Sequence, residues 1–277
     1  MLDKSHAQSV TLERLALWKE NVKVSLSKDD KGYNVTGDER INPDKVLSRV
    51  TGILNVIDKP ALRTWAMDQA LAYIKEQTSG HPVVGSLLLD SILENAPNAH
   101  KKKRDTAANY GTEAHALLQY LCIDSEIAIP DKFLPVVNAW NTWMAESGLQ
   151  IVDTEVSMYY HNNIAFAGTA DLIAVNAEGE PVIVDYKTGA HIYQEAALQM
   201  GAYSMALAYC NNNYKFFSYE QIEKTRAIVI RLPKEEGELP EIKEVADIMK
   251  HQAAFTHACK LRQWMSDRGK WVRKPRL

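Results

Sequence analysis

Three charged residues in the second half of the chain have the types and spacing that metal-assisted chemistry requires. Asp185 and Lys187 end the apolar run 181–187, and because side chains alternate along a strand they share one face. Asp171 belongs to the preceding apolar run, so a hairpin of the two runs would place it beside Asp185. Neighbouring carboxylates repel unless a cation bridges them, and a nearby lysine can orient or deprotonate a water molecule. The pattern predicts a divalent-cation site beside Lys187.

Each part of this pattern also has a simpler interpretation. A D-x-K triplet recurs at residues 29–31 in a polar segment, so Asp185 and Lys187 could form only a surface ion pair. Asp171 could accept hydrogen bonds from turn amides near Gly168. Against this, an aspartate inside a buried strand is costly unless it is paired or bound to a metal.

Two predicted helices carry further candidate residues. His115 follows the pair Gly111-Thr112 and could supply a nitrogen ligand, although a lone histidine is more often structural. Gln199 and Tyr203 are four residues apart, which places the amide and the phenol on one helix face. The same spacing occurs in the segment 69–73, where it fits a simple amphipathic helix.

The elements that must position these residues follow from hydrophobic periodicity and turn chemistry. We expect strands at 151–160, 164–175, 181–187 and 225–232, with helices at 191–210 and 241–266. Upstream we expect a helix at 11–21, a hairpin within 22–36, and mostly helical chain over 44–123, beginning near Val46, followed by a helix at 131–147. The fold class is therefore α/β: a mixed central sheet of three antiparallel strands plus a crossover strand, flanked by helices. We expect a mostly helical N-terminal region at 1–104 and a catalytic core with a basic tail at 105–277.

Composition narrows the class of protein without identifying it. The chain has 277 residues, of which 46% are hydrophobic and 24% charged, and a formal net charge of −3. These are ordinary globular values, and no apolar stretch is long enough to span a membrane. Three separated cysteines predict neither disulfides nor a zinc site, so we expect a reducing, cytoplasmic compartment. The segment 260–277 holds seven basic residues and one acidic residue, and a second basic run occupies 101–104; such clusters can follow a phosphate backbone or simply be solvated.

Taken in order, these residues resemble the RecB-like branch of the PD-(D/E)XK nuclease superfamily. The matching motifs, within about residues 105–210, are a G-T-x-x-H helix, a G-T-x-D strand, a D-x-K-T-G strand end and a Q-x-x-x-Y helix. A looser likeness to phage-type exonuclease-like members extends upstream to Val50-Thr51-Gly52-Ile53-Leu54. Several relatives bind an iron–sulfur cluster through four cysteines, so a chain with three implies the cluster-free subgroup.

The resemblance implies a role for each candidate residue. Asp171, Asp185, His115 and the main-chain carbonyl of Tyr186 would hold Mg²⁺ or Mn²⁺. Lys187 would act with the two aspartates in catalysis, by positioning the attacking water and stabilising the developing charge. The residues expected to support the site or to bind substrate are Glu155, Gln199, Tyr203, Lys101, Lys102, Lys103 and Arg104. We expect Glu155 near the metal ligands without being one of them.

The implied activity is hydrolysis of DNA to products with 5′-phosphate ends. No flexible linker separates the N-terminal helices from the His115 helix, so we expect those helices to pack over the site and form a covered passage. Such a passage favours an exonuclease that threads single-stranded ends, with Trp65 or Tyr110 stacking bases. The alternatives are a DNA-binding or assembly subunit with a vestigial site, and a metal-dependent enzyme acting on another substrate. No membrane partner is expected, and protein partners do not follow from the sequence.

Overall fold

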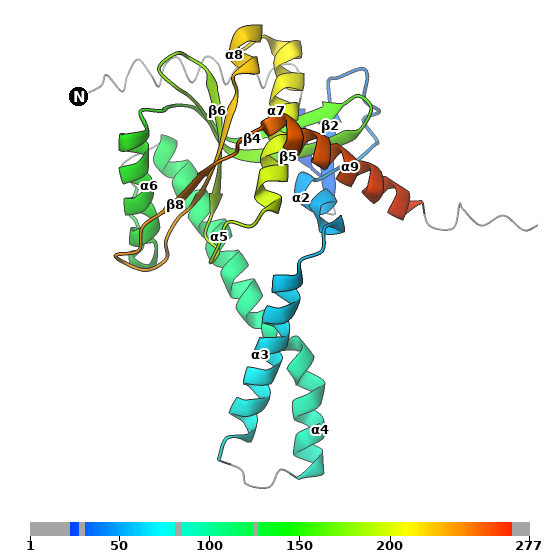
Figure 1. Ribbon diagram of the computed structural model, residues 1–277, viewed down its shortest axis with the longest axis vertical. Helices are drawn as coiled ribbons and strands as arrows, with labels where there is room; N and C mark the ends of the chain where they lie inside the picture. Colours follow the sequence, from blue (N-terminus) through cyan, green and yellow to red (C-terminus); the bar gives the residue numbers. More distant parts are fainter. Residues whose placement is uncertain (1–22, 28–30, 81–84, 124–126, 268–277) are drawn as a thin grey trace, which may run out of the picture. The chain divides into compact units, whose positions relative to one another are not determined.

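The computed structural model describes residues 23–27, 31–80, 85–123 and 127–267 (Figure 1). The chain divides into two compact units. The larger unit combines the chain up to Ile57 with the chain from His115 onward, and the smaller unit comprises Asp58–Ala114. The helix predicted at 11–21 and residues 268–277 of the basic tail lie outside the described residues.

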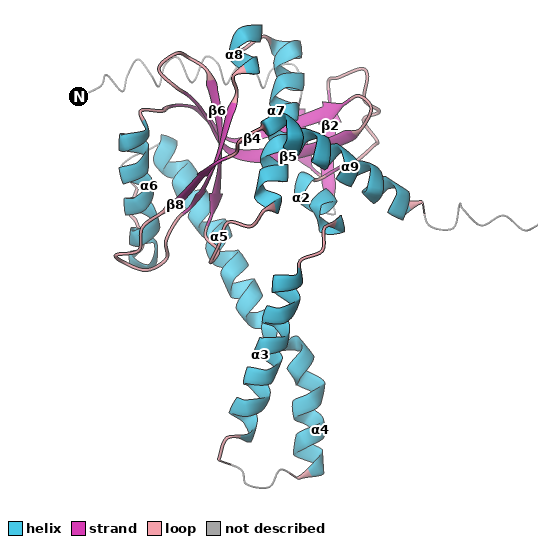
Figure 2. Cartoon of the chain, viewed as in Figure 1, coloured by secondary structure: helices cyan, strands magenta, loops and turns pink. Residues whose placement is uncertain are grey.

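A five-stranded sheet forms the centre of the larger unit (Figure 2). In spatial order its strands are β4 (Gln150–His161), β5 (Ala165–Val175), β6 (Pro181–Lys187), β7 (Arg226–Arg231) and β8 (Glu241–Glu244). Neighbouring strands are antiparallel except β6 and β7, which run parallel on either side of a helical crossover. The mixed sheet predicted from the sequence, with three antiparallel strands and a crossover strand, is confirmed.

A polar turn sets the register between β5 and β6. The side-chain oxygen of Asn176 accepts hydrogen bonds from the N–H groups of Glu178 and Glu180, at 3.1 and 2.8 Å. Gly179 has a φ of 76°, a conformation that a residue with a Cβ rarely adopts. The turn leaves Val175 paired with Pro181. Every later pair of the β5–β6 ladder follows from this register.

Helices cover both faces of the sheet. Helix α7 (Glu195–Tyr214) contacts β4, β5, β6 and β7, and helix α9 (Ile248–Ser266) packs against α7. Gly201 allows this close approach, because a Cβ there would lie 2.7 Å from the backbone of His251. On the opposite face, Trp140 of helix α6 (Leu134–Ser147) donates a hydrogen bond to the hydroxyl of Tyr186 at 3.0 Å. Helix α5 (Ala99–Ile123) adds the buried side chain of Leu118.

A small three-stranded sheet completes the larger unit. Its strands are β1 (Lys23–Leu26), β2 (Gly32–Thr36) and β3 (Leu47–Ser48), followed by the helical turns α2 (Val50–Ile53) and η1 (Leu54–Val56). The predicted hairpin is confirmed by the antiparallel pairing of β1 with β2. The prediction of a helix that begins near Val46 is wrong for its first residues, because Leu47 pairs with Tyr33 in the sheet. The side chains of Val35 and Leu47 are buried in the same core as those of the central sheet.

The prediction of a helix at 241–266 is also wrong for its first residues. Residues Glu241–Glu244 form strand β8, which pairs antiparallel with β7 and carries an ion pair of 2.7 Å between Arg226 and Glu244. Alternating polar residues suit an exposed edge strand as well as a helix, so local pattern could not decide between them. Helix α9 begins only after Asp247, whose carboxylate accepts the N–H of Lys250. A short helix, α8 (Tyr219–Glu223), between α7 and β7 was not predicted.

The smaller unit is a set of helices. It contains α3 (Pro60–Thr78), α4 (Ser86–Asn95), the 3₁₀ turn η2 (Ala96–Asn98) and the first part of α5. Pro60 begins α3, as expected for a residue without an N–H group. The domain boundary predicted after residue 104 falls within α5. None of the described helices is long and apolar enough to cross a membrane.

Candidate active site

Adjacent strands bring the two predicted aspartates to neighbouring positions. The β5–β6 ladder ends at the pair Leu172 and Val184, so Asp171 and Asp185 are the next residues on their strands. At this point Oδ2 of Asp171 accepts a hydrogen bond of 2.6 Å from the N–H of Tyr186. The carboxylate therefore takes the place of a ladder partner where the two strands separate.

Glu155 lies on the other side of Asp171. The ladder pairs on either side of them show that Glu155 of β4 is opposite Asp171 of β5. Glu155 has a φ of 49°, in the left-handed region that residues with side chains seldom adopt. Backbone strain of this kind costs about 1–3 kcal/mol and is concentrated at functional sites. The strained residue Glu155 thus lies opposite the candidate ligand Asp171 on the neighbouring strand.

His115 reaches the same place from helix α5. Its Nδ1 lies 3.1 Å from Oδ1 of Asp171, so both carboxylate oxygens of Asp171 have partners. The imidazole also meets the ring of Tyr186 edge to face, with ring centroids 5.8 Å apart. Because Tyr186 is itself held by Trp140, the histidine ring rests on a buried aromatic support.

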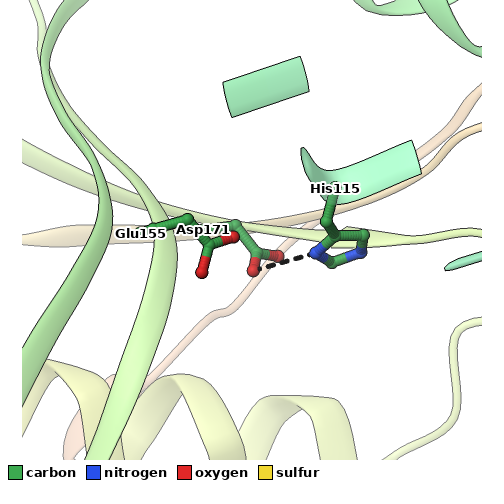
Figure 3. Close-up of side chains that lie close together, drawn as sticks. All are labelled: His115, Glu155 and Asp171. Atoms are coloured by element: carbon green, nitrogen blue, oxygen red, sulfur yellow. Dashed lines mark hydrogen bonds and ion pairs between the residues drawn. The ribbon is translucent and has the colours of Figure 1, made fainter. Parts of the chain in front are cut away.

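His115, Glu155 and Asp171 together can hold a cation (Figure 3). One ligand atom from each lies within 4.8 Å of the other two. Ligands on opposite sides of Mg²⁺ or Ca²⁺ are about 4 to 5 Å apart, so the three atoms suit a shared ion of this size. Two carboxylates and one imidazole are a donor set that first-row divalent metals accept. The side chains present therefore fit a divalent cation.

Asp185 and Lys187 form a second group, which is anchored to helix α7. Asp185 is only 2% exposed and pairs with the ammonium group of Lys187. The side-chain amide of Gln199 contacts both: its Nε2 donates to Asp185 at 2.9 Å and its Oε1 accepts from Lys187 at 3.2 Å. The same Nε2 donates to the hydroxyl of Tyr203 at 2.9 Å. One amide thus orients the acid, the lysine and the phenol.

Glu155 and Asp185 resist ionisation. Burial, reinforced by the charge of Asp171, raises the pKa of Glu155 to about 7. Burial also raises the pKa of Asp185 to about 6, and the neighbouring Asp171 adds to the effect while Lys187 opposes it. Three carboxylates held close together therefore carry a free-energy cost that a bound cation would relieve.

The basic groups of the site favour their charged forms. Burial lowers the pKa of Lys187, but the charges of Asp185 and Asp171 and the hydrogen bond to Asp185 together raise it by more, so the net pKa lies above the usual value. Burial also lowers the pKa of His115, and the charge and hydrogen bond of Asp171 raise it. The net pKa of His115 is likewise raised. Lys187 therefore remains protonated at neutral pH, which suits it to stabilise negative charge rather than to act as a general base.

The structure brings most of the predicted site residues together. His115, Asp171, Asp185, Lys187 and Gln199 are linked by the contacts above, and Tyr203 joins them through Gln199. The phenol of Tyr186 points to Trp140, so only its main chain is available for the expected role. Glu155 lies closer than expected, within the group of potential ligands. An acid on the first strand was the available signal, but only the strand register shows that it meets Asp171.

The contacts described above do not include the basic run at 101–104. Residues 101–104 belong to the smaller unit and are exposed on α5. Lys103 donates to Gln69 at 2.6 Å, and Arg104 pairs with Asp105 at 2.7 Å. Trp65, half-buried on α3, meets the ring of His100 edge to face.

Clustered acids, a histidine and a protonated lysine, brought together by neighbouring strands and a helix, are typical of metal-dependent hydrolytic sites. The family model of the PD-(D/E)XK nuclease superfamily matches residues 87–273. The chain belongs to this superfamily. Its members use divalent metal ions, in agreement with the donor set described above.

Comparisons with individual proteins add only distant similarities. None of the curated proteins matches the chain. Among solved structures, an alkaline exonuclease (LHK-Exo) from Laribacter hongkongensis is similar at 12% identity and a TM-score of 0.36, covering 79% of this chain and 91% of that one. The protein SSO0001 is similar at 11% identity and a TM-score of 0.31, covering 71% of this chain and 86% of that one.

Proposed function

We propose that this protein is a deoxyribonuclease that depends on Mg²⁺ or Mn²⁺. The proposal rests on one observation in a chain that belongs to a nuclease superfamily. Two groups of side chains are juxtaposed: the ligand set of His115, Glu155 and Asp171, and the buried pair of Asp185 and Lys187. Like charges are kept together at a cost, as expected where a cation and a phosphate bind.

The ligands would be divided between two strands and a helix. Asp171 and His115 would hold the cation with Glu155, and Asp185 and the main-chain carbonyl of Tyr186 would complete the set. When bound, the cation supplies positive charge that lowers the pKa of a water molecule and offsets the charge of the scissile phosphate. Oxygen ligands suit Mg²⁺, whereas the imidazole of His115 favours Mn²⁺.

Lys187 would act on the phosphate and the attacking water. Since its pKa is raised, it donates hydrogen bonds as an ammonium group and stabilises charge that develops on the phosphate oxygens. Gln199 would restrict this ammonium group to one position, because its amide also holds Asp185. Attack of water on phosphorus with departure of the 3′-oxygen would leave 5′-phosphate ends.

We further propose that the substrate is a single strand that is degraded from an end. In support, the helix that carries the basic run also carries His115, because α5 is continuous over Ala99–Ile123. The exposed basic run of Lys101, Lys102, Lys103 and Arg104 would contact phosphates, and Trp65 or Tyr110 would stack on bases.

The test is cleavage of labelled DNA by the purified protein, with linear substrates labelled at one end and circles labelled internally. Linear and covalently closed circular substrates, single- and double-stranded, are incubated with Mg²⁺, Mn²⁺ or EDTA, with Asp185→Asn as the inactive control. We expect linear single strands to be shortened from an end and closed single-stranded circles to survive. Rapid nicking of the circles would change the proposal to an endonuclease. Binding without any cleavage would indicate a DNA-binding or assembly subunit.

A further inference from the structure

Three hydroxyl groups form a chain next to the candidate ligands. The phenol oxygen of Tyr33 lies 2.8 Å from Oγ1 of Thr169, and Oγ of Ser157 lies 2.9 Å from the same atom. The residues come from β2, β5 and β4, so two different sheets contribute to this hydroxyl cluster. A main-chain bridge between Arg49 and Ala167 holds the small sheet against β5 close to Thr169.

The hydroxyl cluster and the candidate ligands share one accessible face. Thr169 and Asp171 are two residues apart on β5, as are Ser157 and Glu155 on β4. All four side chains are half-buried, whereas their neighbours Val156, Met158, Gly168, Ala170 and Leu172 are buried. Alternation along β5 places Thr169 and Asp171 on the same side, about 6.7 Å apart. Ser157 lies on this side through its contact with Thr169, and Glu155 through its proximity to Asp171.

A count of protons shows that the hydroxyl cluster can donate to a ligand. Three hydroxyl groups carry three protons, and the two hydrogen bonds between them use two. Within the described part of the chain, no further hydrogen bond involves these three oxygens. One O–H proton therefore remains for an external acceptor on the half-buried face.

We propose that the hydroxyl cluster of Tyr33, Thr169 and Ser157 acts as a unit and donates one hydrogen bond to the phosphate next to the scissile one. The inference rests on the proposed nuclease function and adds a subsite to it. A backbone phosphate is an acceptor that matches the remaining donor, and the spacing along β5 lets one strand occupy both places. The donors are uncharged, so they orient the strand beside three carboxylates without disturbing the charge balance of the metal site.

The first test compares DNA binding and metal binding in hydroxyl-deletion variants. Thr169→Val and Tyr33→Phe keep the side-chain shape and remove the hydroxyl; Thr256→Val and Tyr160→Phe are matched controls outside the site. The probe is a fluorescein-labelled single strand of about 20 nucleotides, with Ca²⁺ replacing Mg²⁺. We expect affinity to fall about tenfold in the site variants, as for a lost hydrogen bond to a charged group, and to be unchanged in the controls.

The salt dependence separates hydroxyl contacts from lysine contacts. Because a neutral donor releases no counterion, the slope of log affinity against log salt should be the same in wild type and Thr169→Val. Mn²⁺ affinity, measured by calorimetry, should also be unchanged. In cleavage with Mg²⁺, KM should rise while kcat stays close to wild type.

A modified substrate then tests the position of the subsite. A neutral methylphosphonate beside the cleaved linkage should weaken binding to wild type and have no further effect on Thr169→Val. Equal losses in both proteins would overturn the proposal, as would unaltered DNA affinity in Thr169→Val and Tyr33→Phe or a loss of Mn²⁺ affinity in either. If the wild-type protein neither binds nor cleaves DNA, the nuclease function fails together with the subsite. If wild type cleaves and the variants bind normally, only the subsite fails.

Discussion

Replacing Glu155 by glutamine should stabilise the metal-free protein and weaken its metal binding. The substitution keeps the side-chain shape and removes a charge that the folded state disfavours. The pKa of Glu155 rises from its ordinary value of 4.5 to about 7 on folding. The Glu155 carboxyl group therefore makes its full contribution to stability below pH 4.5 and loses that contribution as the pH rises through 7, whereas glutamine at this position has no such pH dependence.

The size of the effect follows from this shift. One pKa unit corresponds to about 1.36 kcal/mol, so the shift sets an upper limit of roughly 3 kcal/mol. Glu155 is half-buried, and solvent screening reduces the expected gain to about 1–2 kcal/mol. For a protein of this size, each kcal/mol raises the Tm by about 2–4 °C. The glutamine variant should thus melt several degrees higher at pH 8, with little difference at pH 4.5.

The assay is thermal unfolding in EDTA at the two pH values, followed by calorimetric titration with Mn²⁺ at pH 8. Glu180→Gln is a matched control with the opposite expectation, because the hydrogen bond from Lys224 lowers the pKa of Glu180 and its ionised form is favoured. That control should lose stability at pH 8. The reasoning is refuted if Glu155→Gln melts at or below the wild-type temperature at pH 8, or if it binds Mn²⁺ as tightly as wild type.

Three further predictions concern the ligands, the lysine and the basic tail. Asp171→Asn should abolish cleavage and leave the protein folded, as judged by activity and circular dichroism; retained activity would remove Asp171 from the site. Gln199→Ala should lower kcat by about tenfold or more with little change in Mn²⁺ affinity, because Lys187 loses its orienting contact. Unchanged kcat would show that the ion pair with Asp185 suffices to orient the lysine. Deleting residues 268–277 should weaken single-strand binding and reduce its salt slope by about 0.7 for each lost phosphate contact. An identical slope would make that segment irrelevant to binding.

The strands of the site were predictable because their signals are local. Apolar runs ended by polar turns marked β4, β5 and β6 to within a residue or two, and the Asn176–Glu180 turn set the hairpin that brings Asp171 near Asp185. The D-x-K spacing places Asp185 and Lys187 on one face of any strand. The predicted contact between the two residues is confirmed by their ion pair.

Other features depend on contacts between distant segments. The polar residues of edge strand β8 would fit the start of a helix equally well. Only the pairing with β7 shows that this segment is a strand. The position of Glu155 depends on the strand register and on its left-handed backbone conformation. No pattern of residue types predicts that conformation.

The sequence by itself determined the order of elements and the chemical types at the site. It placed acids on two neighbouring strands, a lysine at a strand end, and a histidine and an amide on helices, because periodicity and turns are encoded locally. Only the tertiary structure decided that His115, Glu155 and Asp171 converge, that Gln199 holds both Asp185 and Lys187, and that Tyr33 reaches Thr169 across two sheets. These contacts join residues far apart in the chain. The geometry of these contacts is set by how whole helices and strands pack together. It cannot be read from the spacing of residues along one element.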